Sequence, residues 1–321
     1  MPWTDLPLDE LRSFRSSVIP AADAREFWAG RVAEARSMAT ESSIIPENSR
    51  LTHIDVMHLE FSGSEGHRIK GWVLKPAGEN GPLPCLVQFI GYGGGRSLHH
   101  EWTLWPSAGW ATLIMDTRGQ AWADTPDPGY AANPQESGFV TRGILDPSTH
   151  YYSRVFVDAV RAVEVARELP FVDPSRVAVG GGSQGGAITI AAAALSEGLI
   201  GALVGVPFWC DVERATTMVT TTPYTELTSY LRARPYDLER IRHTLSYIDG
   251  TVLASLASTP ALFEIGLMDD ICPPSTGYAA FNAWAGEKEV REYHWSGHEG
   301  GDSHHTMITL DWLSEKSEER L

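Results

Sequence analysis

The sequence predicts an α/β protein with one mostly parallel central sheet flanked by helices, in a single domain that spans residues 1–321. Two observations predict this class. Short apolar runs, typical of strands buried on both faces of a sheet, alternate with helical segments along most of the chain. The chain is also 43% hydrophobic and 21% charged, which is ordinary for a globular protein. A chain of this length can bury a large core, and α/β proteins of this size often form one domain.

The first 50 residues are expected to form a helical extension that precedes the sheet. The segment DAREFWAGRVAEARSMA places Phe27, Val32 and Ala35 among charged residues, the pattern of an amphipathic surface helix. The pattern changes over residues 51–76, where apolar and polar residues alternate on both sides of the break SGSEG. This alternation predicts a pair of antiparallel strands.

The remaining strands and helices are predicted from apolar runs and helical periodicity. The expected strands cover residues 85–91, 111–116, 176–181, 202–208, 261–266 and 290–295. The expected helices cover residues 158–170, 183–196 and 305–316. Residues 210–250 interrupt this alternation with a threonine-rich run and helical stretches. We expect that segment to be a small insertion over the carboxyl edge of the sheet, near the active site.

Charge and cysteine content argue against several classes of partner. Asp and Glu outnumber Lys and Arg by 41 to 25, for a formal net charge of −16. A surface this acidic repels phosphate backbones and anionic lipids, so neither nucleic acid nor a membrane is expected as a partner. The three cysteines lack the paired spacing of a disulfide framework or a zinc site, and no metal or other cofactor is expected. The N-terminus lacks the features of a secretory signal, and the longest apolar runs are too short to span a bilayer. Both observations predict a cytoplasmic location.

The run VAVGGGSQGGAITI contains a G-x-S-x-G pattern with Ser183 between Gly181 and Gly185. It follows an apolar strand and opens a helix, the context in which this motif marks the nucleophile of an α/β-hydrolase fold. The nucleophile of that fold sits on a sharp, strained turn, and small neighbours let the strand and the helix approach each other. The N-terminus of the helix also places partial positive charge near the developing oxyanion. The alternative is a glycine-rich turn in which Ser183 only caps the helix.

An acid and a base follow Ser183 in the chain order typical of α/β-hydrolases. The segment ALFEIGLMDDICPPS ends an expected strand at Asp269 and Asp270, and HWSGHEGG places His298 in a glycine-flanked loop. Both lie past the carboxyl ends of strands, where α/β sheets place their sites. His298 is expected to take the Ser183 proton, while an aspartate orients the imidazole. The spacing does not separate Asp269 from Asp270, because adjacent residues in a turn point in different directions and only one can reach His298.

A serine hydrolase also needs two backbone N–H donors that stabilise the oxyanion. One belongs to the residue after the nucleophile, which is Gln184. The other is expected from Tyr92 in the glycine-rich loop QFIGYGGGRS, which follows an early strand. The alternative is that this loop is only a glycine-rich surface turn.

Four motifs together resemble the acetyl xylan esterase / cephalosporin C deacetylase family, carbohydrate esterase family seven. They are RGQ at residues 118–120, GGSQGG around Ser183, GLMDDICPPST around Asp269 and GHEGG around His298. The connecting text GILDPSTHYYSRVFVDAVRAVE and TLSYIDG is also similar to the family. The resemblance covers roughly residues 50–315, which is most of the chain.

This resemblance implies a role for each motif. The acid of the family corresponds to Asp269, and its oxyanion donors correspond to Tyr92 and Gln184. The RGQ motif is mainly structural in the family, and Arg118 and Gln120 are expected near the site, with Arg118 holding loops there through charge-assisted hydrogen bonds. Two positions differ from the family pattern, since AWAD follows RGQ in place of glycines and Ile90 stands where histidine is common. Both segments lie near the pocket in the family, so they bear on substrate preference.

The resemblance also implies an activity and an assembly. Members of the family are metal-free hydrolases that remove acetyl groups from small alcohols, including acetylated xylo-oligosaccharides and cephalosporin C. They form hexamers whose active sites face an internal cavity. We therefore expect a serine esterase that works through an acetyl-enzyme on Ser183 and assembles as a homo-oligomer.

Three other functions are considered. One is a serine peptidase of the same fold, although that group usually carries a large additional domain for which this chain leaves no room. A second is a carboxylesterase of broader specificity. The third is a non-catalytic binding protein, although such proteins typically lose a member of the triad, and all three members are present here.

Overall fold

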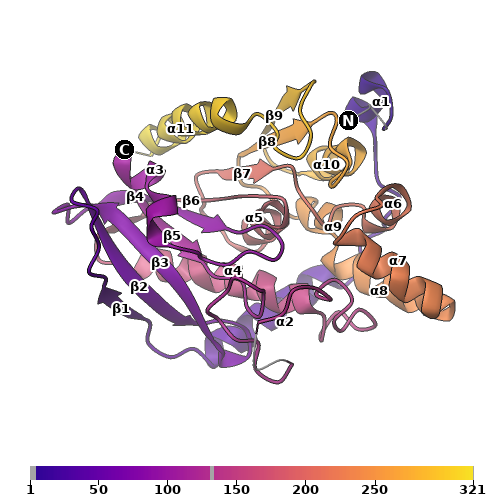
Figure 1. The fold of residues 1–321 in the computed structure, drawn as a ribbon, viewed down its shortest axis with the longest axis horizontal. Helices are drawn as coiled ribbons and strands as arrows, with labels where there is room; N and C mark the ends of the chain where they lie inside the picture. Colours follow the sequence, from indigo (N-terminus) through magenta and orange to yellow (C-terminus); the bar gives the residue numbers. More distant parts are fainter. Residues whose placement is uncertain (1–4, 131–133, 321) are drawn as a thin grey trace.

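A computed structural model describes residues 5–130 and 134–320, and its centre is one sheet that contains nine strands in the described part of the chain (Figure 1). The strand order is β1-β2-β3-β5-β4-β6-β7-β8-β9. The strands are β1 (Ser43–Pro46), β2 (Ile54–Ser62), β3 (Arg68–Pro76), β4 (Leu83–Phe89), β5 (Ala111–Met115), β6 (Val172–Gly182), β7 (Ala202–Gly205), β8 (Ala261–Gly266) and β9 (Lys288–Tyr293). The α-helices are α1 (Leu8–Ser13), α2 (Ala24–Ser37), α3 (Leu104–Ser107), α4 (Tyr151–Glu168), α5 (Gln184–Leu195), α6 (Val212–Met218), α7 (Tyr224–Ala233), α8 (Leu238–Ile248), α9 (Gly250–Ala254), α10 (Pro274–Ala283) and α11 (Asp302–Glu318).

The sheet changes from antiparallel to parallel along its width. The strands β1, β2 and β3 pair antiparallel, and β3 is also antiparallel to β5. From β5 to β9 every neighbouring pair is parallel. The predicted α/β fold with a mostly parallel sheet is confirmed, and so is the antiparallel strand pair expected over residues 51–76.

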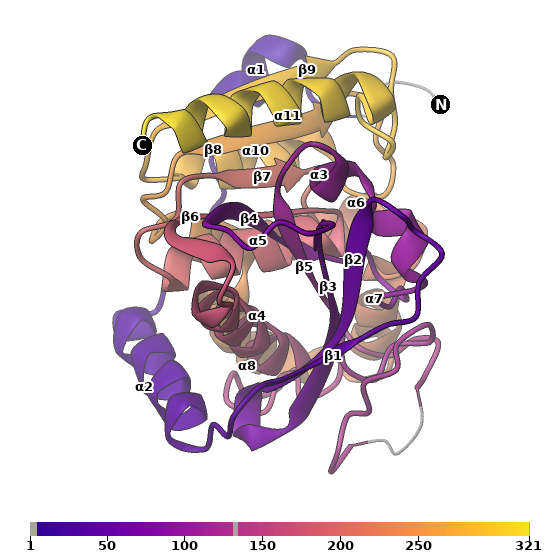
Figure 2. The ribbon, with the colours of Figure 1, turned by 90° about the vertical axis from the view of Figure 1, so that its left-hand side faces the viewer.

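The two faces of the sheet are covered by different helices, with α11 on one side and α4 and α2 on the other (Figure 2). Alternate residues of a strand point to opposite faces, so each central strand serves both layers. On β4, Leu86 packs with Trp105 and Trp312 on the side of α3 and α11. Its neighbours Cys85 and Val87 belong to the larger core that includes α4 and α5. The mostly apolar runs of these central strands therefore predicted the parallel sheet correctly.

The first 50 residues differ in part from the helical extension that was expected. They hold α1 and α2, but residues 14–20 between the two helices have no regular secondary structure, and β1 adds an edge strand that the sequence did not predict. Pro20 disfavours helix in the residue before it, which is consistent with the break. The buried side of α2 is formed by Trp28, Val32 and Ala35 rather than by Phe27, which is only partly buried.

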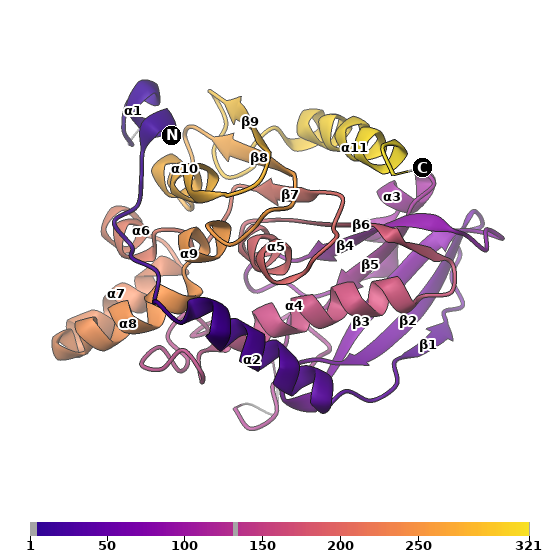
Figure 3. The ribbon, with the colours of Figure 1, turned by 180° about the vertical axis from the view of Figure 1, so that it is seen from behind.

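Residues 210–250 contain α6, α7 and α8, in agreement with the helical stretches expected there. In Figure 3 these helices gather beside α9 and α10, at the end of the molecule away from β1. Other boundaries differ from expectation. The helix α4 begins at residue 151 rather than 158, β7 ends at 205 rather than 208, β9 ends at 293, and α10 was not predicted. Within the described residues, none of the helices is long and apolar enough to cross a membrane.

Candidate active site

Ser183 lies on a sharp turn between β6 and α5, with the unusual backbone angles φ 57° and ψ −121°. A positive φ is strained for a residue with a side chain, and such strain is typical of functional turns. The end of β4 crowds this turn. A Cβ atom on Gly181 would lie 2.6 Å from the Phe89 carbonyl oxygen, and one on Gly185 would lie 2.4 Å from the same atom. Only glycine fits at these two positions, so the motif has the geometry of a nucleophile elbow.

Asp269 and His298 are in direct contact. The Asp269 Oδ2 atom lies 2.8 Å from His298 Nδ1, and Asp269 Oδ1 accepts hydrogen bonds from the backbone N–H groups of Ile271 (2.8 Å) and Cys272 (2.9 Å). Because an ionised carboxylate only accepts, this contact places the imidazole proton on Nδ1 and leaves Nε2 as a base. Asp270 is exposed, and within the described residues it makes no hydrogen bond to His298. The structure thus separates two aspartates that the spacing alone left equivalent.

Cys272 connects the Asp269–His298 pair to Ser183. Its backbone N–H donates to Asp269, and its thiol interacts with the Ser183 side chain. Burial raises the pKa of the Cys272 thiol well above its ordinary value, so it is protonated at neutral pH and is a poor nucleophile. In the described part of the chain no hydrogen bond joins Ser183 to His298, and such bonds often form only when substrate binds.

The two expected oxyanion donors lie on segments joined by a pair of buried amide side chains. Gln120 Nε2 donates to Gln184 Oε1 (2.7 Å), and Gln184 Nε2 donates to the carbonyl oxygen of Ile90 (3.1 Å). Gln120 Oε1 in turn accepts the backbone N–H of Gly93 (2.7 Å). These bonds hold the residues on either side of Tyr92 against the turn that carries Ser183. Within the described residues, the backbone N–H groups of Tyr92 and Gln184 have no protein acceptor and remain available to a ligand.

The Tyr92 side chain contacts α7, within residues 210–250. Its hydroxyl donates to Glu226 Oε1 on α7 (2.6 Å) and accepts the backbone N–H of Phe139 (3.3 Å). Burial and the Glu226 carboxylate both raise the pKa of Tyr92, so the hydroxyl stays protonated. The sequence offered no signal for Glu226, since it is 134 residues from Tyr92.

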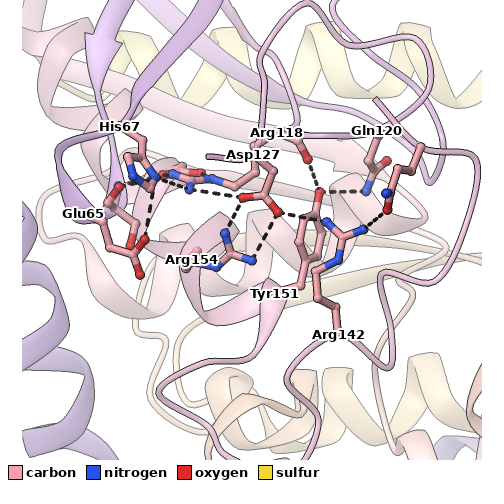
Figure 4. A network of polar contacts seen from close by, with 11 residues as sticks. Glu65, His67, Arg118, Gln120, Asp127, Arg142, Tyr151 and Arg154 are labelled. Atoms are coloured by element: carbon pink, nitrogen blue, oxygen red, sulfur yellow. Dashed lines mark hydrogen bonds and ion pairs between the residues drawn. The ribbon is translucent and has the colours of Figure 1, made fainter. Parts of the chain in front are cut away.

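Arg118 is fully buried, but it contacts other segments than the expected site loops. Its guanidinium makes two 2.7 Å hydrogen bonds to Asp158 on α4 and a longer one to the Ser64 carbonyl oxygen in the turn after β2. The Arg118 carbonyl oxygen accepts from the Tyr151 hydroxyl, which itself accepts from Gln120 (Figure 4). Within the RGQ motif, Gln120 therefore holds the oxyanion loop, the segment after β4 that carries Tyr92. Arg118 is linked to Gln120 only through the Tyr151 hydroxyl.

Three arginines surround the buried carboxylate of Asp127 (Figure 4). Arg154 and Arg142 hydrogen-bond to it, and Arg118 lies 3.6 Å away. Side chains of Asp127, Arg118 and Arg154 are fully buried. This cluster ties the segment after the RGQ motif to α4, and no motif pointed to it. Among the described residues, no group of three or more His, Cys, Asp or Glu side chains is arranged to hold a metal ion.

Comparison with known proteins connects this geometry to one family. The sequence model of the acetyl xylan esterase (AXE1) family matches residues 1–316. The acetyl esterase Axe7A of Xylanibacter ruminicola is 27% identical over 281 residues, and the match covers 82% of this chain but only 60% of that longer protein.

Two solved structures are similar over nearly their whole length. An acetyl xylan esterase from Paenibacillus sp. R4 has a TM-score of 0.90 and 36% identity, over 97% of this chain and 99% of that one. Acetyl xylan esterase 1 from Thermoanaerobacterium sp. JW/SL YS485 has a TM-score of 0.89 and 29% identity, with the same coverage. The family match over residues 1–316 includes the Ser183 turn, the RGQ segment and the His298 loop, and on this evidence the chain belongs to the acetyl xylan esterase family of α/β-hydrolases.

Proposed function

We propose that this protein is a serine esterase that hydrolyses acetyl esters of small alcohols through an acetyl-enzyme on Ser183. The observation that carries the proposal is the strained turn at Ser183, beside two free backbone N–H groups and the Asp269–His298 pair. Membership of the acetyl xylan esterase family supports the same activity.

The reaction follows from the positions of these groups. His298 Nε2 accepts the Ser183 proton as the serine oxygen attacks the ester carbonyl carbon, and Asp269 stabilises the resulting imidazolium. The negative charge that develops on the carbonyl oxygen is held by the N–H groups of Tyr92 and Gln184. The intermediate collapses as the C–O bond to the alcohol breaks, and His298 returns the proton to the alcohol. A water molecule then repeats the sequence on the acetyl-enzyme and releases acetate.

The proposed substrates are acetylated xylo-oligosaccharides and acetyl esters of the cephalosporin C type. The first class is supported by the similarity of this chain to two acetyl xylan esterases of known structure. Turnover of p-nitrophenyl acetate, acetylated xylo-oligosaccharides and cephalosporin C by wild type and Ser183→Ala tests the proposal. We expect activity in the wild type only, together with labelling of Ser183 by a fluorophosphonate. Equal acetate release by both proteins would overturn the serine mechanism.

The same assay separates the related activities. A series of p-nitrophenyl esters from acetate to octanoate should show a steep fall with acyl length, whereas a flat profile would favour a broad carboxylesterase. Faster release of chromophore from an aminoacyl-Pro substrate than from the acetate ester would favour a peptidase.

Assembly and location are separate proposals. We propose a homohexamer, on the family resemblance, and light scattering should give about six times the monomer mass of 35.2 kDa. A cytoplasmic location stays a prediction, which cell fractionation with an antibody to this chain tests directly.

A further inference from the structure

We infer that Glu264 is a positioning residue for His298, because its largely buried side chain accepts a hydrogen bond from the loop that carries His298 and its ionised form holds that loop more firmly. The inference rests on the proposed esterase function. It adds a group that lies outside the three residues of the triad and behind the turn of the nucleophile.

The His298 loop closes directly on the Glu264 side chain. Glu264 lies on β8, and its Oε1 atom accepts the backbone N–H of Gly301 at 2.6 Å. Gly300 has a φ of 57°, and a Cβ atom there would lie 2.2 Å from the same Oε1. A side chain at Gly300 would therefore displace either the loop or the carboxyl group.

The other end of the loop rests on the same strand. A Cβ atom on Gly266 would lie 2.0 Å from the Gly297 carbonyl oxygen, so β8 and the loop are in backbone contact there. Three residues further along, the same segment carries Asp269. One strand thus fixes both Asp269 and the two ends of the His298 loop, and Glu264 is the polar side chain of that strand that reaches the loop.

The surroundings of Glu264 contain both charges and neutral polar groups. Its Oε2 atom lies 3.8 Å from His305 Nε2 on α11, and His305 Nδ1 is 2.9 Å from the Tyr293 hydroxyl. Burial lowers the pKa of His305 to about 4, so this imidazole is neutral at neutral pH and offers Glu264 no positive charge. On the β7 side the neighbour is Gly205, which carries no charge. Charged or titratable groups face Glu264 or its partner His305 from three directions. His298 comes from the loop, and Asp302 and His305 come from α11. Arg291 and Tyr293 come from β9.

The carboxyl group of Glu264 titrates near neutral pH. Burial raises the pKa of its carboxyl group to about 7, with a smaller contribution from Asp302 in the same direction, while the Gly301 N–H and His298 lower it. The carboxyl group lines a groove of about 260 Å³ between α3 and α11, which gives protons access to it. The Gly301 N–H favours the ionised form of Glu264, so the ionised carboxylate is the stronger acceptor and holds the loop more firmly. Ionised Glu264 therefore helps to keep His298 in position against Asp269.

Activity and stability should depend on Glu264 in opposite directions. Its folded-state pKa is raised, so its contribution to stability is full at low pH and is lost as the pH rises through about 7. The ionised form of Glu264, which holds the His298 loop more firmly, is thus also the form that lowers the stability of the fold. A residue with only a structural role would lower both activity and stability when it is replaced.

The test is Glu264→Gln, which keeps an acceptor for the Gly301 N–H but removes the charge. We expect kcat for p-nitrophenyl acetate at pH 8 to fall by roughly threefold to tenfold, with KM within twofold, because a hydrogen bond to an ionised acceptor is roughly twice as strong as one to a neutral acceptor. The kcat profile should lose an ionisation near pH 7, and the melting temperature at pH 8 should rise by about 2–4 °C. The melting temperatures of the two proteins should agree only at about pH 4 and below, where Glu264 is protonated in both the folded and the unfolded protein.

Two further variants complete the experiment. Thr309→Val, in the same groove, should leave kcat, the pH profile and KM unchanged, and Glu264→Asp should keep the ionisation but lose part of kcat because the shorter side chain draws back from Gly301. Wild-type kcat and pH profile in Glu264→Gln would overturn the inference, as would a parallel loss of activity and stability. Absence of activity and of Ser183 labelling in the wild type would instead refute the proposed function.

Discussion

The two halves of the candidate site are held in place in different ways. On the oxyanion side, Gln120, Gln184 and Arg118 form buried hydrogen bonds between segments distant in the chain. On the acid–base side, β8 and the His298 loop meet through glycine backbone and the Glu264 carboxyl group, and the bond from Gly301 to Glu264 joins residues 37 apart in the chain. The first half is a neutral amide network backed by paired charges, and the second contains groups that titrate. Changes in the first half should therefore alter rates at every pH, whereas changes in the second should alter the pH dependence.

The largest effect is expected from Asp269→Asn, which breaks the acid–base half at its centre. The amide cannot stabilise the imidazolium and favours the wrong tautomer of His298, so kcat should fall by roughly 10⁴. Stopped assays with p-nitrophenyl acetate measure the loss. Asp270→Asn is the matched control, because that side chain is exposed, and it should retain wild-type kcat.

Asp127→Asn tests the paired charges that back the oxyanion half. It leaves Arg118 and Arg154 buried without their shared carboxylate, and loss of one partner of a buried pair typically costs about 3–5 kcal/mol. Urea unfolding should show a lower free energy of unfolding. Asp124→Asn is a suitable control, since the Asp124 side chain is largely exposed and should contribute less. An unchanged midpoint for Asp127→Asn would mean that the cluster does not stabilise the fold.

Gln120→Ala removes the amide that joins the oxyanion loop to the Ser183 turn. The Gly93 N–H and the Gln184 side chain lose a partner, so we expect the Tyr92 N–H to move away from the oxyanion and kcat to fall by roughly 10². The shape of the pH profile should not change, in contrast to the Glu264 variants. A shifted profile would contradict the separation of the two halves.

The smallest effect is expected from Glu226→Gln, which weakens the link between the oxyanion loop and α7. A hydrogen bond to a charged acceptor contributes about 1.5–3 kcal/mol, and a neutral amide keeps part of it, so kcat should fall by about threefold to tenfold. Tyr92→Phe removes the same bond from the other side. The double variant should then be no slower than the slower single variant, which a double-mutant cycle measures.

The sequence by itself determined the features that depend on neighbours in the chain. The turn at Ser183 follows from a strand, a G-x-S-x-G motif and a helix in direct succession, and the parallel sheet follows from mostly apolar strands that alternate with helices. The family was also recognisable, because its motifs are short and contiguous. The RGQ motif placed Arg118 and Gln120 near the site, although it did not show that Gln120, and not Arg118, reaches the oxyanion loop.

Only the tertiary structure decided the features that depend on contacts across the chain. The family resemblance already pointed to Asp269, but only the structure shows its contact with His298 and the turn after β8 whose backbone N–H groups hold its carboxylate. Gln120 and Gln184 are 64 residues apart, and nothing local predicts that they pair. Glu264 looks like an ordinary residue of a strand in the sequence, and its raised pKa arises from burial that only the packing of the loop and α11 creates. Local spacing sets the chemistry that is present, and desolvation and distant contacts set how strongly each group acts.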